Sequence, residues 1–302
     1  MIVRPGCAIF LAPTMPELPE VETVVRGLRA SLPGRTILDV RLGKSDFVDD
    51  ASALGDCLPG TRISDVTRLG KFICIVLESL EKSLGPESIS APRLNLIIHL
   101  GMTGQLTVRP ASDPVAPHTH CFFALDDGRE LRYTDIRRFG RMLIVPESRM
   151  AEFLGHLGKE PLQIGPDEFC RDLGSRRARI KALLLDQRVL RGIGNIYADE
   201  SLFRARIHPA QIAENLGKKQ LLALHRAVRE ILTAAIRLRG SSISDYVDAN
   251  GKRGEFQQRH RVYQRTGKSC FRCRRKIRRV IVAGRSSHFC PRCQPAPRSR
   301  KK

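Results

Sequence analysis

Four cysteines near the C-terminus constrain the fold of this chain more than any other feature. Cys270, Cys273, Cys290 and Cys293 form two Cys-x2-Cys pairs separated by sixteen residues. Two such knuckles joined by an insert of hairpin length bring four thiolates into a tetrahedron, which suits Zn²⁺. Because protein ligands fill all four positions, one structural zinc ion is predicted. Disulfides or a redox motif are disfavoured, since the pair is doubled within one short basic module and nothing else indicates secretion.

The insert between the cysteine pairs is expected to be a β-hairpin that turns near Ala283-Gly284-Arg285-Ser286. An arginine at the tip of such a hairpin is well placed to hold a phosphate with its forked guanidinium. The alternative is that Arg285 is one basic residue among many, and the spacing leaves both interpretations open.

Basic residues are concentrated in the same region. Residues 251–302 contain eighteen lysines and arginines and a single acid, Glu255, in a chain whose formal net charge is +21. Polyanions are the natural partners of such a surface, because each neutralised phosphate releases condensed counterions. A solvated basic tail would explain Arg298–Lys302, but it is a poor explanation for a region that also contains four regularly spaced cysteines.

The hydropathy pattern changes once along the rest of the chain. Apolar and β-branched segments predict a β-rich domain over residues 16–147 with one helix packed on it. After a linker at 148–160, helical periodicity predicts a helical domain over 161–262, followed by the zinc module at 263–293 and a basic tail at 294–302. The strands are expected at Thr36–Leu42, Phe72–Leu77, Leu94–Leu100 and Met142–Val145, a hairpin at Cys121–Leu125 and Glu130–Tyr133, and the helices at Ala178–Leu185, Asn195–Ala205 and Lys218–Arg239.

The stretch Met15–Thr23 contains a proline directly followed by a carboxylate. Pro19 and the acids after it are what a helix start needs, but they leave Pro16 and Glu17 unexplained. As an N-terminus, Pro16 would carry a secondary amine with a pKa of about 8, which can attack a sugar aldehyde carbon and form an iminium. Within a longer chain the same nitrogen is a tertiary amide. This interpretation therefore requires that residues 1–14 be absent from the working protein.

The first fourteen residues loosely resemble a secretory signal. Their apolar part is short, prolines interrupt it, and no small-x-small cleavage site precedes Met15. A mis-set start codon explains residues 1–15 better than export does. The chain has no run of 18 apolar residues, so no membrane span is expected, and a cytoplasmic, nucleoid-associated protein is predicted. The remaining cysteines show no pairing logic and favour a reducing compartment: Cys7, Cys57, Cys74, Cys121 and Cys170.

Six motifs occur in a fixed order along residues 16–293. They are Pro16–Glu22, Arg68–Lys71, His99–Gly104, Arg132–Gly140, Gly194–Tyr197 and the four-cysteine module. In this order the chain closely resembles bacterial formamidopyrimidine-DNA glycosylase. The resemblance implies an α+β fold: a β-sandwich-like domain with one N-terminal helix, then a helix–two-turns–helix domain that ends in a β-hairpin zinc finger. A lesion-recognition loop is expected within residues 244–258.

The resemblance also implies an activity. The chain would be a bifunctional DNA glycosylase and AP lyase that excises oxidised purines, such as 8-oxoguanine and formamidopyrimidines, from double-stranded DNA. It would act as a monomer without a nucleotide cofactor. In that family Pro16 would attack C1′, Glu17 would act as the acid on the opening sugar, and Lys71 would contact the lesion or its phosphate. Arg285 would serve phosphate binding and the δ-elimination step.

The same resemblance assigns residues that hold the DNA. Met102, Arg137 and Phe139 would fill the gap left by the flipped nucleotide, although in isolation Met102 and Phe139 would more often be core residues. Glu20 and Glu200 would be supporting carboxylates. Ile136 stands where many relatives have proline. Contacts to the DNA backbone are implied for His118, Arg138, Arg177, Lys181 and Asn195.

Two alternatives remain at this point. An endonuclease VIII-type glycosylase has the same fold and chemistry but acts on oxidised pyrimidines. Such relatives usually begin Pro-Glu-Gly-Pro, whereas this chain has Pro-Glu-Leu-Pro at 16–19. A non-catalytic zinc-finger protein that binds damaged DNA would explain the charge and the cysteines. It would have no use for the Pro16–Glu17 pair or for Lys71.

Overall fold

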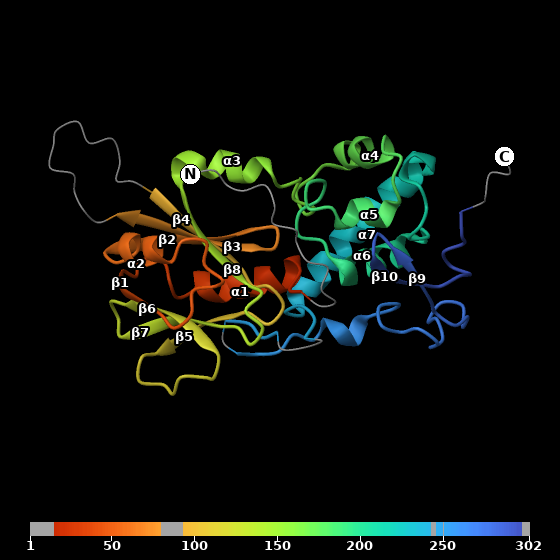
Figure 1. The fold of residues 1–302 in the computed structure, drawn as a ribbon. Helices are drawn as coiled ribbons and strands as arrows, with labels where there is room; N and C mark the ends of the chain where they lie inside the picture. The colour runs from red at the N-terminus through yellow and green to blue at the C-terminus, as the bar shows by residue number, and fades with distance from the viewer. Residues whose placement is uncertain (1–14, 80–92, 243–245, 250, 298–302) are drawn as a thin grey trace.

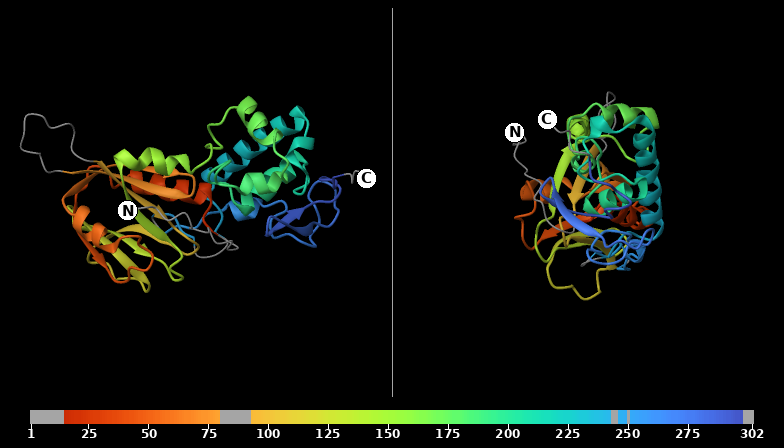
Figure 2. Two further views of the ribbon diagram at one scale, coloured as in Figure 1. Left: turned by 45° about the horizontal axis from the view of Figure 1, so that its top comes forward. Right: turned by 90° about the vertical axis from the view of Figure 1, so that its right-hand side faces the viewer.

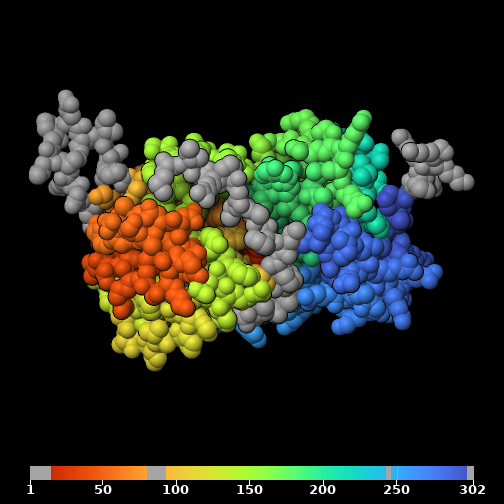
Figure 3. Space-filling model, viewed as in Figure 1, coloured from red at the N-terminus to blue at the C-terminus, as the bar shows by residue number. Residues whose placement is uncertain are grey.

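The computed structural model describes residues 15–79, 93–242, 246–249 and 251–297. These residues form a β-rich lobe and a helical lobe that lie side by side, with a small hairpin at the far end of the helical lobe (Figure 1). The left view of Figure 2 shows the same arrangement from another side. The space-filling view shows the residues of the β-rich lobe on the left and those of the helical lobe and the hairpin on the right (Figure 3). The expected leader falls almost wholly on residues 1–14, which lie outside the described residues.

The β-rich lobe is a sandwich of two four-stranded antiparallel sheets, with strand orders β2-β3-β4-β8 and β1-β6-β7-β5. Helix α1 (Leu18–Arg29) lies between them (Figure 1) and packs its valines and Leu28 into the shared core. The predicted hairpin and all the predicted strands are confirmed. The strands are β1 (Ile37–Leu42), β2 (Thr61–Leu69), β3 (Phe72–Ser79), β4 (Arg93–His99), β5 (Gln105–Pro110), β6 (Thr119–Leu125), β7 (Arg129–Thr134) and β8 (Arg141–Pro146).

Three elements of this lobe were not predicted: β2, β5 and the short helix α2 (Ala51–Cys57). In β2 the register shifts between Ile63 and Asp65. This irregularity places the buried residues Ile63 and Val66 three positions apart instead of two. The sequence of β2 therefore lacks the strict alternation that identifies a half-buried strand.

The helical lobe is built around α6 (Asn195–Ala205) and α7 (Lys218–Arg237), which pack against each other. Both helices were predicted, α6 with the same bounds. The expected linker at 148–160 contains a 3-10 turn and a short helix. The other elements of the lobe and its connections are η1 (Glu147–Arg149), α3 (Met150–Gly155), α4 (Pro166–Gly174), α5 (Ile180–Leu185), η2 (Ala213–Asn215) and η3 (Phe256–Arg259).

Each lobe contributes residues to the core of the other. Leu18 at the start of α1 packs into the core of the helical lobe. Tyr246 and Ala249, which follow α7, pack into the core of the β-rich lobe. A Cβ placed on Gly27 of α1 would lie 2.7 Å from the Cβ of Ala249, so this contact needs a glycine. The segment expected to contain the lesion-recognition loop is therefore held against α1 at these two residues, while 244, 245 and 250 lie outside the described residues.

The C-terminal module is the predicted hairpin, with strands β9 (Arg278–Val282) and β10 (Arg285–Phe289). Ala283 and Gly284 form a two-residue turn with φ values of 51° and 69°, the geometry that matches the twist of a hairpin. Arg285 is the first residue of β10 and pairs with Val282, so it stands just after the tip. No helix within the described ranges is long and apolar enough to cross a bilayer.

Candidate functional site

The Glu17 carboxylate lies at the N-terminus of α6. It accepts hydrogen bonds from the main-chain amides of Gly194 at 2.9 Å, Ile196 at 2.9 Å and Tyr197 at 3.3 Å. Free amides and the helix dipole make a helix N-terminus a site for negative charge. A Cβ on Gly194 would lie 2.3 Å from the Glu17 carboxyl carbon, so the carboxylate fits only against a glycine. Pro16 and Glu17 are both buried at this junction of the two lobes.

Two cations share the surroundings of Glu17. Lys71 is carried by the β2–β3 turn, and Arg285 by the first residue of β10. Burial raises the pKa of the Glu17 carboxyl, and the Lys71 ammonium opposes that shift. Burial lowers the pKa of Lys71; the Glu17 charge opposes this, and the Arg285 charge adds to it. Three residues predicted from separate motifs thus lie in one electrostatic environment.

A second carboxylate fixes the backbone around Glu17. Glu20 accepts a hydrogen bond from the Glu17 amide at 3.0 Å, another from the Tyr197 hydroxyl, and a third from the Ser241 amide at 2.6 Å. Burial, and then the neighbouring Glu17 charge, raises the pKa of Glu20 to about 7. Glu200 is also buried and accepts from three consecutive amides that lead into the zinc module. Both buried carboxylates thus fix the backbone next to the site, Glu20 at Glu17 and Glu200 at residues 261–263.

Lys181 is predicted to contact the DNA backbone. Its side chain is fully buried and its ammonium lies 2.7 Å from an oxygen of Asp199, which is also fully buried. The ammonium donates to the Ser286 carbonyl and to the Ser287 hydroxyl, each at 2.8 Å. The ammonium is enclosed by these three partners, and a direct contact with the DNA backbone stays a prediction. Lys181 joins α5 and α6 to β10, next to Arg285.

The three residues predicted to fill a DNA gap come from two neighbouring loops of the β-rich lobe. Phe139 is 50% exposed, and the Arg137 guanidinium stands over its ring at 4.6 Å. Met102 is only 6% exposed. A Cβ on Gly101 would lie 2.4 Å from the Phe139 carbonyl carbon, so the two loops are in close contact. Ile136, in the position of the usual proline, is 54% exposed beside them.

The other residues predicted to hold the DNA backbone lie on both lobes. His118 and Arg138 are loop residues with φ values of 64° and 54°, and Asn195 is the first residue of α6. Both arginines of this set contact carboxylates. Arg138 lies 2.6 Å from an oxygen of Asp46, and Arg177 lies 3.1 Å from one of Glu214.

The four cysteines of the C-terminal module meet the requirements of a zinc site. Their sulfur atoms all lie within 4.8 Å of one another. The Cys270 and Cys293 sulfurs are 4.0 Å apart, and those of Cys273 and Cys290 are 3.3 Å apart. Tetrahedral Zn–S bonds of about 2.3 Å place sulfurs roughly 3.8 Å from one another. Four thiolates in this arrangement hold one structural zinc ion and leave no open position.

Family models match three consecutive parts of the chain. They are described as the formamidopyrimidine-DNA glycosylase N-terminal domain (residues 15–142), the H2TH domain of the same glycosylase (157–247) and a zinc finger found in FPG and IleRS (267–296). A formamidopyrimidine-DNA glycosylase of Solibacter usitatus is 45% identical over 282 residues, which cover 93% of this chain and 99% of that protein. The chain belongs to the formamidopyrimidine-DNA glycosylase family.

Other relatives agree with this assignment. A glycosylase of the same name from Heliobacterium modesticaldum is 44% identical over 291 residues, covering 93% of this chain and 100% of that protein. Among solved structures, Lactococcus lactis Fpg in complex with DNA containing an abasic site matches with a TM-score of 0.82 and 33% identity. A complex of a mutant of that enzyme with Fapy-dG DNA matches with a TM-score of 0.82 and 32% identity. Both alignments cover 93% of this chain and 100% of the other.

Sequence reasoning missed an ion-pair cluster that joins the lobes of this family member. Glu160 accepts two hydrogen bonds from Arg68, at 3.0 and 3.1 Å, and one from Arg191 at 3.3 Å. Arg68 also donates to Glu22 of α1 at 2.9 Å. Arg68 stands three residues before Lys71, so the cluster holds the turn that carries this lysine. Charged residues this far apart in the sequence give no periodic signal that could have revealed it.

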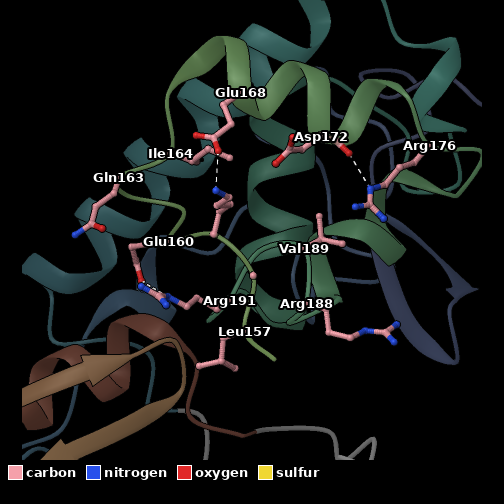
Figure 4. A pocket seen from close by; sticks show the side chains of 12 residues that line it. Leu157, Glu160, Gln163, Ile164, Glu168, Asp172, Arg176, Arg188, Val189 and Arg191 are labelled. Atoms are coloured by element: carbon pink, nitrogen blue, oxygen red, sulfur yellow. Dashed lines mark hydrogen bonds and ion pairs between the residues drawn. The ribbon is translucent and has the colours of Figure 1, made fainter. Parts of the chain in front are cut away.

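A cavity of about 500 Å³ lies beside this cluster, between the expected linker and α4. Figure 4 shows its charged lining residues, several of which bond to one another across the walls. Lys159 pairs with Glu168 at 2.9 Å, and Arg191 with Glu160. Glu17, Lys71 and Arg285 do not line this cavity. The chemistry is therefore assigned to the junction at α6 and not to the cavity.

Proposed function

We propose that this chain is a bifunctional DNA glycosylase and AP lyase of base excision repair that removes oxidised purines from double-stranded DNA. Its similarity in sequence and fold to proteins named formamidopyrimidine-DNA glycosylase supports the glycosylase activity. The observation that carries the proposal is the position of Glu17: a buried carboxylate next to Pro16, capped by the amides of α6 and flanked by Lys71.

The proposed reaction starts from a chain in which Pro16 is the N-terminal residue. Its amine nitrogen forms a bond to C1′ as the N-glycosidic bond breaks and the base leaves with a proton. Glu17, whose pKa is raised by burial, protonates the ring oxygen as the sugar opens. The resulting iminium is a cation, and the nearby carboxylate stabilises it. β-Elimination then breaks the C3′–O bond, and δ-elimination breaks the C5′–O bond, which leaves a gap with phosphate at both ends.

The remaining predicted residues would hold the DNA around this chemistry. Lys71 and Arg285 would bind phosphate or the lesion, because both are cations whose charges interact with Glu17 at the site. Met102, Arg137 and Phe139 would occupy the gap in the duplex. Backbone contacts are proposed for the exposed residues His118 and Arg177, for the half-buried Arg138, and for Asn195 at the start of α6. Lys181 is also proposed to act through the position of β10. The domain bounds predicted from the sequence are kept as part of this proposal, as is monomeric action.

Borohydride trapping on duplex DNA tests the proposal. The substrate is an 8-oxoguanine:cytosine duplex, and the proteins are a chain that begins at Pro16, the full 302-residue chain and the Glu17→Gln variant of the shorter chain. Intact mass is recorded for each. A covalent adduct only on chains whose N-terminus is Pro16, with loss of base release in Glu17→Gln, would support the assigned roles. Equal base release by Glu17→Gln would contradict the role of Glu17.

A parallel reaction separates this proposal from its alternatives. A duplex with an oxidised pyrimidine is cut faster than the 8-oxoguanine duplex if the chain is an endonuclease VIII-type enzyme. One solved complex of the Lactococcus lactis enzyme contains an oxidised pyrimidine. Binding of such DNA therefore does not separate the two enzyme types, whereas the relative rates of cutting do. DNA binding without any adduct from correctly processed protein would identify a non-catalytic damaged-DNA binder.

A further inference from the structure

One buried carboxylate lies where the two gap-filling loops meet. Asp135 has no exposed surface. Its Oδ1 accepts hydrogen bonds from the Thr103 hydroxyl and from the Arg137 amide, the latter at 3.2 Å. Its Oδ2 accepts from the Tyr133 hydroxyl and from the Gly140 amide, both at 2.9 Å. Four donors thus converge on one side chain, and two of them are the amides at either end of the loop that carries Phe139.

The packing around this carboxylate leaves little freedom to either loop. A Cβ on Gly140 would lie 1.7 Å from the Tyr133 hydroxyl oxygen, and a Cβ on Gly104 would lie 2.9 Å from the same atom. The Tyr133 hydroxyl is therefore enclosed between the ends of the two loops and donates to Asp135. Burial and the Asp135 charge both raise the pKa of Tyr133, so the phenol keeps its proton.

The main chain of Asp135 reaches a third DNA-facing segment. Its amide donates to the His118 carbonyl at 3.0 Å, and its carbonyl lies 3.1 Å from Nε2 of the buried His120. His118 has a positive φ of 64°, a conformation that a non-glycine residue keeps only when its surroundings hold it there. The same residue thus joins the loop of Met102, the loop of Arg137 and Phe139, and the segment of His118.

We propose that Asp135 is a positioning residue for insertion into the DNA gap: its carboxylate holds the two loops in the one arrangement that presents Met102, Arg137 and Phe139 together. This inference rests on the proposed function of those three residues. The physical reason is the number of donors. An ionised carboxylate accepts from all four, whereas an amide in its place presents two hydrogens to groups that are themselves donors. The hydroxyl donors can rotate away, but the main-chain amides cannot.

The variant that tests this proposal is Asp135→Asn. It keeps the size of the side chain, but whichever way the amide turns, its NH2 group faces either the Arg137 amide or the Gly140 amide. The Gly140 amide would then lose its acceptor, whereas the Arg137 amide would keep only its second acceptor, the Thr103 hydroxyl oxygen at 3.2 Å. A buried donor left without a partner is costly. Thr103→Val is a second variant that leaves the carboxylate in place. It removes the hydroxyl that donates to Asp135 and accepts from the Arg137 amide at 3.2 Å, and so removes both links between Thr103 and the second loop. Thr61→Val is the matched control: Thr61 is also buried in this lobe and donates to the Leu58 carbonyl at 2.7 Å, away from the loops.

Insertion is measured directly with a duplex that carries 2-aminopurine next to the cytosine opposite a formamidopyrimidine lesion. The fluorescence rise reports the unstacking that accompanies gap filling, and kcat and KM are measured on the same duplex. Borohydride trapping on a duplex with a preformed abasic site reports the chemical step, for which flipping costs less. Thermal midpoints are recorded for all variants.

We expect Asp135→Asn to lose most of the fluorescence rise and to lower kcat/KM by about tenfold or more, as the loss of a buried hydrogen-bond partner permits. Trapping at the abasic site should change far less, and Thr61→Val should match wild type in fluorescence at a similar thermal midpoint. A wild-type fluorescence signal in Asp135→Asn would overturn the positioning role alone. If wild type and Phe139→Ala gave the same signal, gap filling by these residues would fail, and the positioning role with it.

Discussion

The side chain of Glu17 caps helix α6 and accepts a hydrogen bond at 2.9 Å from the amide of Gly194, which lies 177 residues later in the chain. The backbone of Gly194 is extended, with φ −126°, so an alanine there carries no conformational penalty of its own. Its Cβ would instead lie 2.3 Å from the Glu17 carboxyl carbon. We expect Gly194→Ala to displace the carboxylate and to reduce the rate of base release by about 100-fold, as the misplacement of a catalytic group does.

A matched control exists at another helix N-terminus. Gly165 is also the N-cap of its helix, α4, and a Cβ there would meet nothing within 4 Å. Single-turnover base release by Gly165→Ala should equal that of wild type. If both alanine variants lost activity equally, the loss would reflect helix capping in general and not the contact with Glu17.

Removal of zinc should abolish activity by releasing Arg285. The hairpin has a small core, formed by the cysteines with Val262, Ile277 and Phe203, and a structural zinc typically contributes about 10 kcal/mol or more to such a module. We expect Cys290→Ser to lose the metal, as measured by elemental mass spectrometry, and to lose strand cleavage. Cys57→Ser, at an exposed cysteine outside the module, should keep both. A metal-free Cys290→Ser protein with normal strand cleavage would contradict this expectation.

Much of the fold follows from local sequence patterns. Helix α6 was predicted with its observed bounds because Gly194 precedes an apolar-faced segment, and the zinc hairpin followed from cysteine spacing. The strand β2 was missed because its bulge removes the alternation. The packing of Tyr246 and Ala249 into the other lobe was missed as well. Such contacts depend on tertiary fit, for example on the space that Gly27 leaves for Ala249. Local hydropathy periodicity does not reveal contacts of this kind.

The site was predicted less evenly than the fold. Glu17, Lys71 and Arg285 each stood in a motif, and the structure brings them together. Lys181 was assigned by resemblance alone, and its environment is set by Asp199 on another helix, with which it forms a buried ion pair. A matching motif shows which residue occupies a position, but it does not show whether that residue is buried in the fold. Asp135 and Glu160 were overlooked for the related reason that a carboxylate acquires its role only from the donors that the fold brings to it.

Acid should destabilise the protein partly through His260. This histidine is buried, with Nε2 3.1 Å from the Ser241 hydroxyl, and burial lowers its pKa to about 4. The unfolded chain, with an ordinary histidine pKa of about 6.5, binds a proton that the folded chain does not. The stability that His260 contributes is therefore complete above pH 6.5 and is lost as the pH falls toward 4. Glu20, with its raised pKa, has the opposite effect on the pH dependence of stability. Because wild type and variant both contain Glu20, its effect cancels in the difference between them.

The measurement is the thermal midpoint of wild type and of His260→Gln between pH 7 and pH 4. The difference between the two proteins should shrink as the pH falls. His156→Gln, at an exposed histidine, controls for the removal of a histidine as such. A His260→Gln difference that stays constant over the whole range would show that the buried imidazole is not the group that titrates.

The ion-pair cluster between the lobes should contribute more stability than any exposed pair. The side chains of Arg68 and Glu160 are only 8% and 5% exposed. Glu160→Gln would leave Arg68 buried with Glu22 as its remaining acid, and loss of one partner of a buried pair costs about 3–5 kcal/mol. The exposed pair of Arg149 and Glu152 is the control, because Glu152→Gln should cost less than about 1 kcal/mol. Urea unfolding of both variants measures these costs.

Since Arg68 precedes the turn that carries Lys71, Glu160→Gln should also slow base release under conditions where it is fully folded. Equal unfolding free energies for the two variants would mean that the buried cluster does not join the lobes.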